Sequence, residues 1–171
     1  TYLVDMADAS TLKFKTSYGS GFRAPSPYEI QYNSSSASPP AQGVILRQET
    51  SEGYEAGVEY LRGDHLHLEA IYFDQEVEDA IEFDLLAFSG YLQNAGIGRS
   101  KGFELSSRYN LNDNWKFTAN YTHNDAEQPN GLPRLRRPQE LANLGVSFFG
   151  LNERLNLNAF YRISRDSFDQ P

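Results

Sequence analysis

TLKFKTSYG, residues 11–19, alternates two kinds of side chain at every step. One set is largely apolar (Leu12, Phe14, Thr16, Tyr18), and the other is polar or small (Lys13, Lys15, Ser17, Gly19). A period of two is typical of a β-strand whose two faces meet different surroundings. The pattern predicts a strand from Thr11 to Phe22 with one apolar and one polar face.

The same alternation returns along the chain, whereas helical periodicity is weak throughout. It covers residues 54–61, 65–83, 102–109, 115–122, 142–148 and 155–164, with a partial strand at 1–4. The strands are bounded by polar and turn-forming residues, as is usual for strands of a sheet. The sequence therefore predicts an all-β fold of about eight antiparallel strands.

The connections between these strands alternate in length. Short ones fall at residues 5–10, 62–64, 110–114 and 150–153, and long polar ones at 23–49, 84–89 and 124–136. Outer-membrane barrels have tight periplasmic turns on one rim and long extracellular loops on the other. The pattern predicts an up-and-down meander that forms part of a barrel wall, with the long loops outside the cell.

The segment from His65 to Phe83 is nearly twice as long as a membrane crossing, which takes about 9–11 residues. Its apolar side runs from Leu66 to Tyr72 and then changes to acidic residues at Asp74, Glu76 and Glu78. Carboxylates cannot face hydrocarbon, so Tyr72 is predicted to mark the outer membrane interface, where aromatic girdles lie. A bulge that reverses the faces beyond Tyr72 is the alternative.

Composition excludes several classes of function. Hydrophobic residues make up 39% of the chain, with no apolar run long enough for a membrane helix. The net charge of −8 argues against nucleic acid, because phosphate-binding surfaces are cationic. Without cysteine, disulfides and thiol chemistry are excluded. The three histidines (His65, His67, His123) accompany no nucleophile motif, so we expect no catalytic site, no metal and no cofactor.

Two charged clusters each admit two interpretations. The acidic series Asp74, Glu76, Glu78, Asp79, Glu82, Asp84 suits either a hard cation such as calcium or a solvated rim, which we favour. The basic cluster Arg134, Arg136, Arg137 suits either an anionic ligand or lipopolysaccharide phosphate. A row of wall arginines opposite carboxylates such as Glu104 is the favoured alternative for the basic cluster.

Four motifs resemble those of one family, the TonB-dependent outer-membrane receptors for siderophores and cobalamin. They are YGSGFRAPSPYE at 18–29, QETSEGYEAG at 48–57, NAG at 94–96 with KGFEL at 101–105, and RRP at 136–138. They occur in the family's order, although Gln48 stands where the family usually has proline. The resemblance covers most of the chain.

The resemblance implies a barrel of about 22 strands around a plug, in the outer membrane of a Gram-negative bacterium. Residues 1–171 then form part of the β-barrel domain, with the plug, the TonB-contacting region and the terminal strand outside them. Residues 1–5 contain no export signal, so we expect the natural start upstream. The implied partners are an iron–siderophore or cobalamin-like ligand, the TonB system, and outer-membrane lipid and lipopolysaccharide.

The long loops supply the candidate ligand contacts. They are Tyr28, Tyr32 and Asn33 in the first long loop, Phe88 and Tyr91 in the second, and Arg134 in the third. Tyrosine and arginine provide rigid contact area and charge at binding sites. We therefore expect a transport receptor and not an enzyme.

Two other classes of protein fit the strand pattern. A complete eight-stranded barrel that anchors or adheres is one, because eight strands can close on themselves. A soluble β-sandwich that binds carbohydrate is the other, because a sandwich also buries one face of each strand. A closed barrel requires its first and last strands to pair, and a sandwich requires a second layer over the apolar face.

Overall fold

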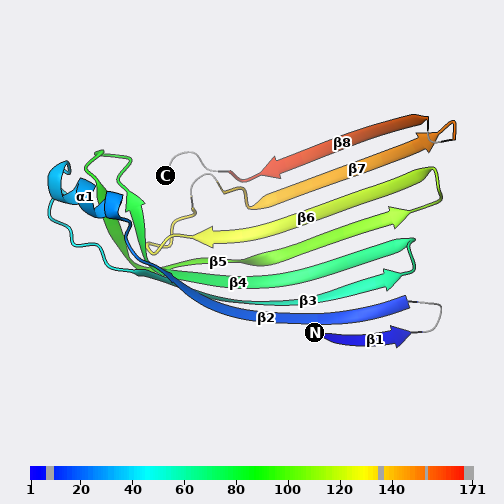
Figure 1. Cartoon of the computed structure of the whole chain (residues 1–171), viewed down its shortest axis with the longest axis horizontal. Coiled ribbons are helices and arrows are strands. Elements are labelled where there is room, and N and C mark those ends of the chain that lie inside the picture. The colour runs from blue at the N-terminus through cyan, green and yellow to red at the C-terminus, as the bar shows by residue number, and fades with distance from the viewer. Residues whose placement is uncertain (7–9, 135–136, 153, 168–171) are drawn as a thin grey trace.

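The computed structural model describes residues 1–6, 10–134, 137–152 and 154–167. In these residues eight strands form one antiparallel sheet in sequence order (Figure 1). The strands are β1 (Tyr2–Met6), β2 (Ser10–Arg23), β3 (Glu49–Arg62), β4 (Leu66–Phe83), β5 (Tyr91–Asn110), β6 (Trp115–Glu127), β7 (Glu140–Gly150) and β8 (Leu155–Arg165). The predicted all-β meander is confirmed.

Pairing between the strands brings like side chains into rows. One row across the sheet reads Phe14, Val58, Ala70, Leu105, Tyr121, Ala142, Ile163. The next row, one residue away, reads Lys13, Glu59, Glu69, Ser106, Asn120, Asn143, Arg162. Because neighbouring residues point to opposite sides of a strand, the sheet has one apolar and one polar face along these rows.

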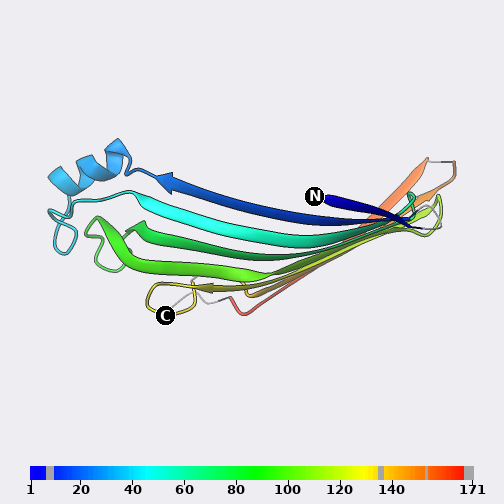
Figure 2. The same ribbon diagram turned by 90° about the horizontal axis from the view of Figure 1, so that it is seen from below.

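The sheet is a single curved layer (Figure 2). In the part of the chain that the structure describes, the buried hydrophobic side chains are limited to Ala41, Ile81 and Ala126, while Phe14 and Leu144 are 45% and 51% exposed. No second layer of described residues covers the apolar face, so the fold is not a sandwich. Apolar surface that is exposed to water costs about 25 cal/mol per Å². The apolar face of the sheet therefore requires contact with lipid.

The sheet is also open. Among the described strands, β1 and β8 lie at opposite edges and each pairs on one side only. An edge strand presents unpaired N–H and C=O groups, and a bilayer offers those groups no partners. The eight strands are therefore a section of a larger barrel and not a closed eight-stranded one.

Loop lengths follow the predicted alternation. The connections after β3, β5 and β7 are tight and lie at one end of the sheet, and those after β2, β4 and β6 are long and lie at the other (Figure 1). The turn between β1 and β2, residues 7–9, lies outside the described residues. His65 was expected in a strand, but it lies in the turn before β4, where its carbonyl accepts from the N–H of Asn110.

The first long connection contains a helix, α1 (Pro27–Ser35), that the loop prediction did not include. Ser26 caps it: the Ser26 hydroxyl accepts from the N–H of Glu29 at 3.3 Å, and the Glu29 carboxylate accepts from the N–H of Ser26 at 2.6 Å. Pro27 at the first helical position suits such a start. No described helix has the length and apolar character to cross a membrane.

β4 keeps its faces well beyond Tyr72. The Tyr54 and Tyr72 rings lie 6.1 Å apart, and both hydroxyls donate to the Asp74 carboxylate, at 3.3 and 3.5 Å. The three side chains therefore share one face, so no reversal occurs directly after Tyr72. The register shifts only between Glu78 and Ala80. The place of Tyr72 at the membrane interface stays a prediction.

Candidate functional site

The long loops bring five aromatic rings together at one end of the sheet. This aromatic cluster consists of Tyr28 and Tyr32 of α1, Phe83 of β4, Phe88 of the β4–β5 loop, and Tyr91 of β5. Tyr91 is central, with ring centroids 5.2, 5.9 and 6.3 Å from Phe83, Tyr32 and Tyr28, and Phe88 lies 6.3 Å from Phe83. These four contacts are edge-to-face, the arrangement that aromatic quadrupoles favour.

The cluster has an exposed rim and a half-buried centre. Tyr28 and Phe88 are 65% and 67% exposed, whereas Tyr32, Phe83 and Tyr91 are half-buried. Burial raises the pKa of Tyr91, and the neighbouring Tyr28 and Glu29 raise it further. The Tyr91 hydroxyl therefore stays protonated at neutral pH. The cluster offers apolar ring surface with polar hydroxyl edges, which suits a bulky ligand of mixed polarity.

Asn33 lies behind the rings. It is 5% exposed, and its side chain pairs with the backbone of Tyr91 twice: Nδ2 donates to the carbonyl at 2.7 Å, and Oδ1 accepts from the N–H at 2.9 Å. The sequence predicted Asn33 as a ligand contact. In the structure, the Asn33 side chain instead joins α1 to β5 through its two hydrogen bonds with Tyr91.

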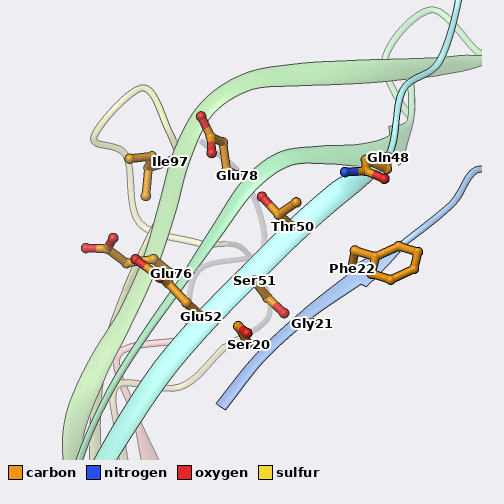
Figure 3. Close-up of a pocket in the computed structure, with 10 residues that line it drawn as sticks. All are labelled: Ser20, Gly21, Phe22, Gln48, Thr50, Ser51, Glu52, Glu76, Glu78 and Ile97. Atoms are coloured by element: carbon orange, nitrogen blue, oxygen red, sulfur yellow. The ribbon is translucent and has the colours of Figure 1, made fainter. Parts of the chain in front are cut away.

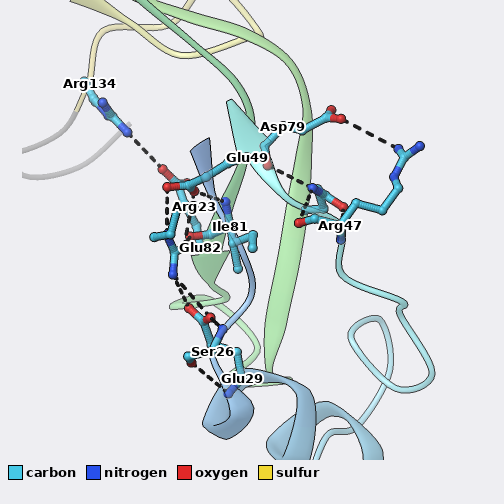
Figure 4. Close-up of polar contacts among 10 residues, drawn as sticks. Arg23, Ser26, Glu29, Arg47, Glu49, Asp79, Ile81, Glu82 and Arg134 are labelled. Carbon is cyan, nitrogen blue, oxygen red and sulfur yellow. Dashed lines mark hydrogen bonds and ion pairs between the residues drawn. The ribbon is translucent and has the colours of Figure 1, made fainter. Parts of the chain in front are cut away.

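Arg23, which was not among the predicted residues, links four elements near the cluster (Figure 4). Nε donates to Glu49 of β3 at 2.7 Å, Nη1 to Glu29 of α1 at 2.9 Å, and Nη2 to the carbonyl of Ile81 of β4 at 3.4 Å. Glu49 also accepts from the N–H of Ile81 at 3.0 Å. The hydrogen bond from Arg23 lowers the pKa of Glu49, which remains charged at neutral pH.

Replacing Arg23 by glutamine is expected to loosen α1 from the sheet by about 1–3 kcal/mol, because two carboxylates lose their shared cation. The lower part of that range applies, since the Arg23 side chain is 44% exposed. In the native chain the pKa of Glu49 lies below its ordinary 4.5, so its stabilisation is present above pH 4.5 and lost as pH falls through the lower value. Protease resistance of the loops between pH 7 and pH 3 would measure this acid loss.

The matched control is Arg47→Gln, because Arg47 is 72% exposed and lies 3.8 Å from its partner Asp79. Arg47→Gln is expected to keep the native dependence of protease resistance on pH. Arg23→Gln is expected to lose protease resistance already at neutral pH and to lose little more between pH 7 and pH 3. Equal profiles for the two variants would contradict the role of Arg23.

The acidic series is mostly paired with cations. Asp74, 4% exposed, accepts from Arg99 at 2.8 Å, and Glu76 lies 3.6 Å from the same arginine. Arg134 donates to Glu82 at 3.4 Å and so joins the third long loop to β4, while Arg136 lies outside the described residues. Within the described ranges, no group of three or more His, Cys, Asp or Glu side chains is placed to hold a metal.

A pocket of about 450 Å³ lies between β2, β3, β4 and β5, on the sheet face continuous with the apolar face (Figure 3). It is lined by Ser20, Gly21, Phe22, Gln48, Thr50, Ser51, Glu52, Glu76, Glu78 and Ile97. None of these belongs to the aromatic cluster. Ser20, Glu52 and Glu76 pair in register and continue the face of Tyr18 and Tyr54, so the pocket opens away from the polar face. We do not assign it to the ligand.

The single-layer meander, with one apolar face and all long loops at one rim, defines a wall section of an outer-membrane β-barrel. Residues 3–171 match the family model described as TonB dependent receptor-like, beta-barrel. The chain belongs to this family of receptors and transporters, and its place is the outer membrane of a Gram-negative bacterium. The predicted resemblance is confirmed. No curated protein matches the chain.

Solved structures share the fold. FpvA of Pseudomonas aeruginosa, bound to heterologous pyoverdines, aligns over 95% of this chain and 22% of its own, at 21% identity and TM-score 0.67. The copper transporter OprC aligns over 95% and 25%, at 22% identity and TM-score 0.72. The ferric-catecholate import receptor Fiu of E. coli K12 aligns over 96% and 24%, at 18% identity and TM-score 0.65. The chain thus spans about a quarter of these receptors.

Proposed function

We propose that this chain is part of a receptor for TonB-dependent uptake of a scarce, bulky nutrient, such as an iron–siderophore or cobalamin-like complex. The observation that carries the proposal is the aromatic cluster. Four of its five rings were predicted separately as ligand contacts, and they lie together at the long-loop rim. Rigid aromatic side chains supply much contact area at little entropic cost.

The remaining parts of the receptor follow from the family. Residues 1–171 are part of the barrel domain, and a plug, a TonB-contacting N-terminal region and a terminal strand lie outside them. Apolar side chains such as Leu105 and Leu144 contact lipid, and Arg134 and Arg137 lie at the loop rim, where they meet ligand or lipopolysaccharide. The receptor carries its ligand without chemical change and is not an enzyme, in keeping with a family of receptors and transporters.

Tyr28→Ala in the full receptor is expected to weaken ligand binding about 30-fold, the equivalent of about 2 kcal/mol for an aromatic anchor. Tyr28→Phe should stay near the native affinity, because it keeps the ring. Binding to whole cells would be measured with ferripyoverdine, a ferric catecholate, cobalamin and a copper salt as probes.

Leu86→Ala is the loop control, since Leu86 is 91% exposed in the β4–β5 loop and outside the cluster. Native affinity in all three variants, for a probe that the native receptor binds, would remove the cluster from the binding site. Growth with the bound probe as the nutrient source, lost on deletion of the gene, would establish uptake.

A further inference from the structure

The loop that carries α1 is joined by direct hydrogen bonds to the β4–β5 loop and to the first residue of β5. Besides the two bonds between Asn33 and Tyr91, the N–H of Ser38 donates to the carbonyl of Ser89 at 2.9 Å. Ser89 and Ala41 are completely buried at this junction. Groups held in this way resist local opening, because separation would leave buried polar atoms without partners.

Gly90 makes the close approach of the two loops possible. Its φ of +142° is a conformation that side chains disfavour. A Cβ added there would lie 2.9 Å from Asn33 Oδ1, 2.9 Å from Ala41 Cβ and 3.0 Å from Ala37 Cβ. Any larger residue would push the α1 loop away from β5.

The β4–β5 loop is ordered by its own hydrogen bonds as well. The Asp84 carboxylate accepts from the Ser89 hydroxyl at 2.6 Å and from the N–H groups of Leu86 and Ala87 at 3.0 and 3.1 Å. The N–H of Asp84 donates to the carbonyl of Gly90 at 2.8 Å. Both partners of the junction are thus shaped before any ligand arrives.

We propose that Asn33 and Gly90 are positioning residues, which fix the two loops as one preformed platform and hold the exposed edges of Tyr28 and Phe88 toward the ligand. The inference rests on the proposed function, because it assigns the platform to the same binding site. A platform that is ordered in advance loses less conformational entropy on binding, so affinity rises without new contacts.

Amide hydrogen exchange of the full, ligand-free receptor tests the platform directly. The amides of Ser38 and Tyr91 are expected to be protected before any ligand is added, and Asn33→Ala or Gly90→Ala should lower that protection at least about tenfold. Ser34→Ala controls for the helix, since the Ser34 hydroxyl is exposed and donates within α1, to the carbonyl of Gln31. Gly43→Ala controls for backbone strain, since Gly43 has φ +77° but nothing within 4 Å of an added Cβ.

Affinity for a ferric catecholate provides the second readout. Asn33→Ala should weaken binding about tenfold in the native background and have no further effect in a Tyr28→Ala, Phe88→Ala background, because Asn33 acts through those two exposed rings. Heat-modifiable folding of the Asn33→Ala receptor in detergent should be unchanged. This control separates a general loss of stability from a change in the position of the rings.

The outcomes are distinct. Exchange of Ser38 and Tyr91 at unprotected rates in the free receptor, or native protection in Asn33→Ala and Gly90→Ala, would overturn the platform and leave the proposed function standing. Protection with no effect of Tyr28→Ala on any bound probe would remove the aromatic cluster from the binding site and overturn the positioning role, and would leave only the joined loops. A receptor that binds none of the probes, and whose deletion leaves growth on each of them unchanged, would overturn the proposed function.

Discussion

Replacing Gly102 by alanine is expected to leave little folded receptor in the outer membrane. Gly102 is buried in β5, and an added Cβ would overlap the carbonyl oxygen of His123 on β6 and lie 2.9 Å from the Phe73 ring on β4. Backbone cannot yield as a flexible side chain does, so β5 and β6 would have to separate and lose ladder bonds. We expect a cost of about 4 kcal/mol, at the upper end of overpacking effects.

Gly19→Ala is the matched control for this substitution. Gly19 lies on the polar face of β2, and nothing stands within 4 Å of its added Cβ. The fraction of heat-modifiable barrel in isolated outer membranes would compare the two variants. We expect near-native assembly for Gly19→Ala, and equal assembly of both variants would show that β5 and β6 are not so close.

Leu105→Arg is expected to cause the second large effect. Leu105 lies in the apolar row between Ala70 and Tyr121, and its side chain is 44% exposed on the face assigned to lipid. An arginine at the bilayer midplane of a barrel costs about 2–4 kcal/mol. The variant should assemble poorly, and the defect should grow in bilayers with thicker hydrocarbon, because the charge lies farther from water.

The neighbouring Ser106→Arg provides the comparison, since it adds the same charge to the opposite face. Ser106 pairs in register with Glu69 and Asn120, so the arginine enters a polar surrounding. Assembly of both variants would be measured in parallel by heat-modifiable mobility. If Ser106→Arg failed and Leu105→Arg assembled, the assignment of the two faces would be reversed.

The strands and their faces were predictable because register follows from side-chain alternation. A slip of one residue would move every apolar side chain to the polar face. Predicting the Lys13 row and the Phe14 row thus required little more than the period of two and the positions of the tight turns. Loop lengths then oriented the wall, since only one rim has room for a ligand.

Helix α1 was missed although its signal is present. Ser26-Pro27-Tyr28-Glu29 has the form of a capping box with proline at the first helical position. The surrounding run of serine and proline is typical of a loop and hid that signal. A search for caps inside long loops would have placed Tyr28 and Tyr32 one helical turn apart on the same side.

The candidate site was predictable only ring by ring. Tyr28, Tyr32, Phe88 and Tyr91 were chosen as loop aromatics, but their contact depends on how two connections, β2–β3 and β4–β5, fold together. Phe83 was not chosen, because it was placed at the end of the predicted strand 65–83 and not in a long loop. The register shift before it, at Asp79 with φ +56°, is a feature that alternation does not reveal. Arg23 was seen only as part of a motif, because its partners Glu29 and Glu49 come from separate elements.

In the proposed receptor, the length of the β4–β5 hairpin sets how far from the cell a nutrient is first held. From Tyr72 to Phe83, β4 continues for eleven residues, on the order of 35 Å of strand at about 3.3 Å per residue. With Tyr72 at the predicted membrane interface, this length is the upper limit of the distance between a ligand on the aromatic cluster and the membrane rim, because barrel strands are tilted. Removing paired residues from β4 and β5 would shorten that distance without altering any ring. Strand length alone would then change how far the ligand must travel, while the residues that bind it stay the same.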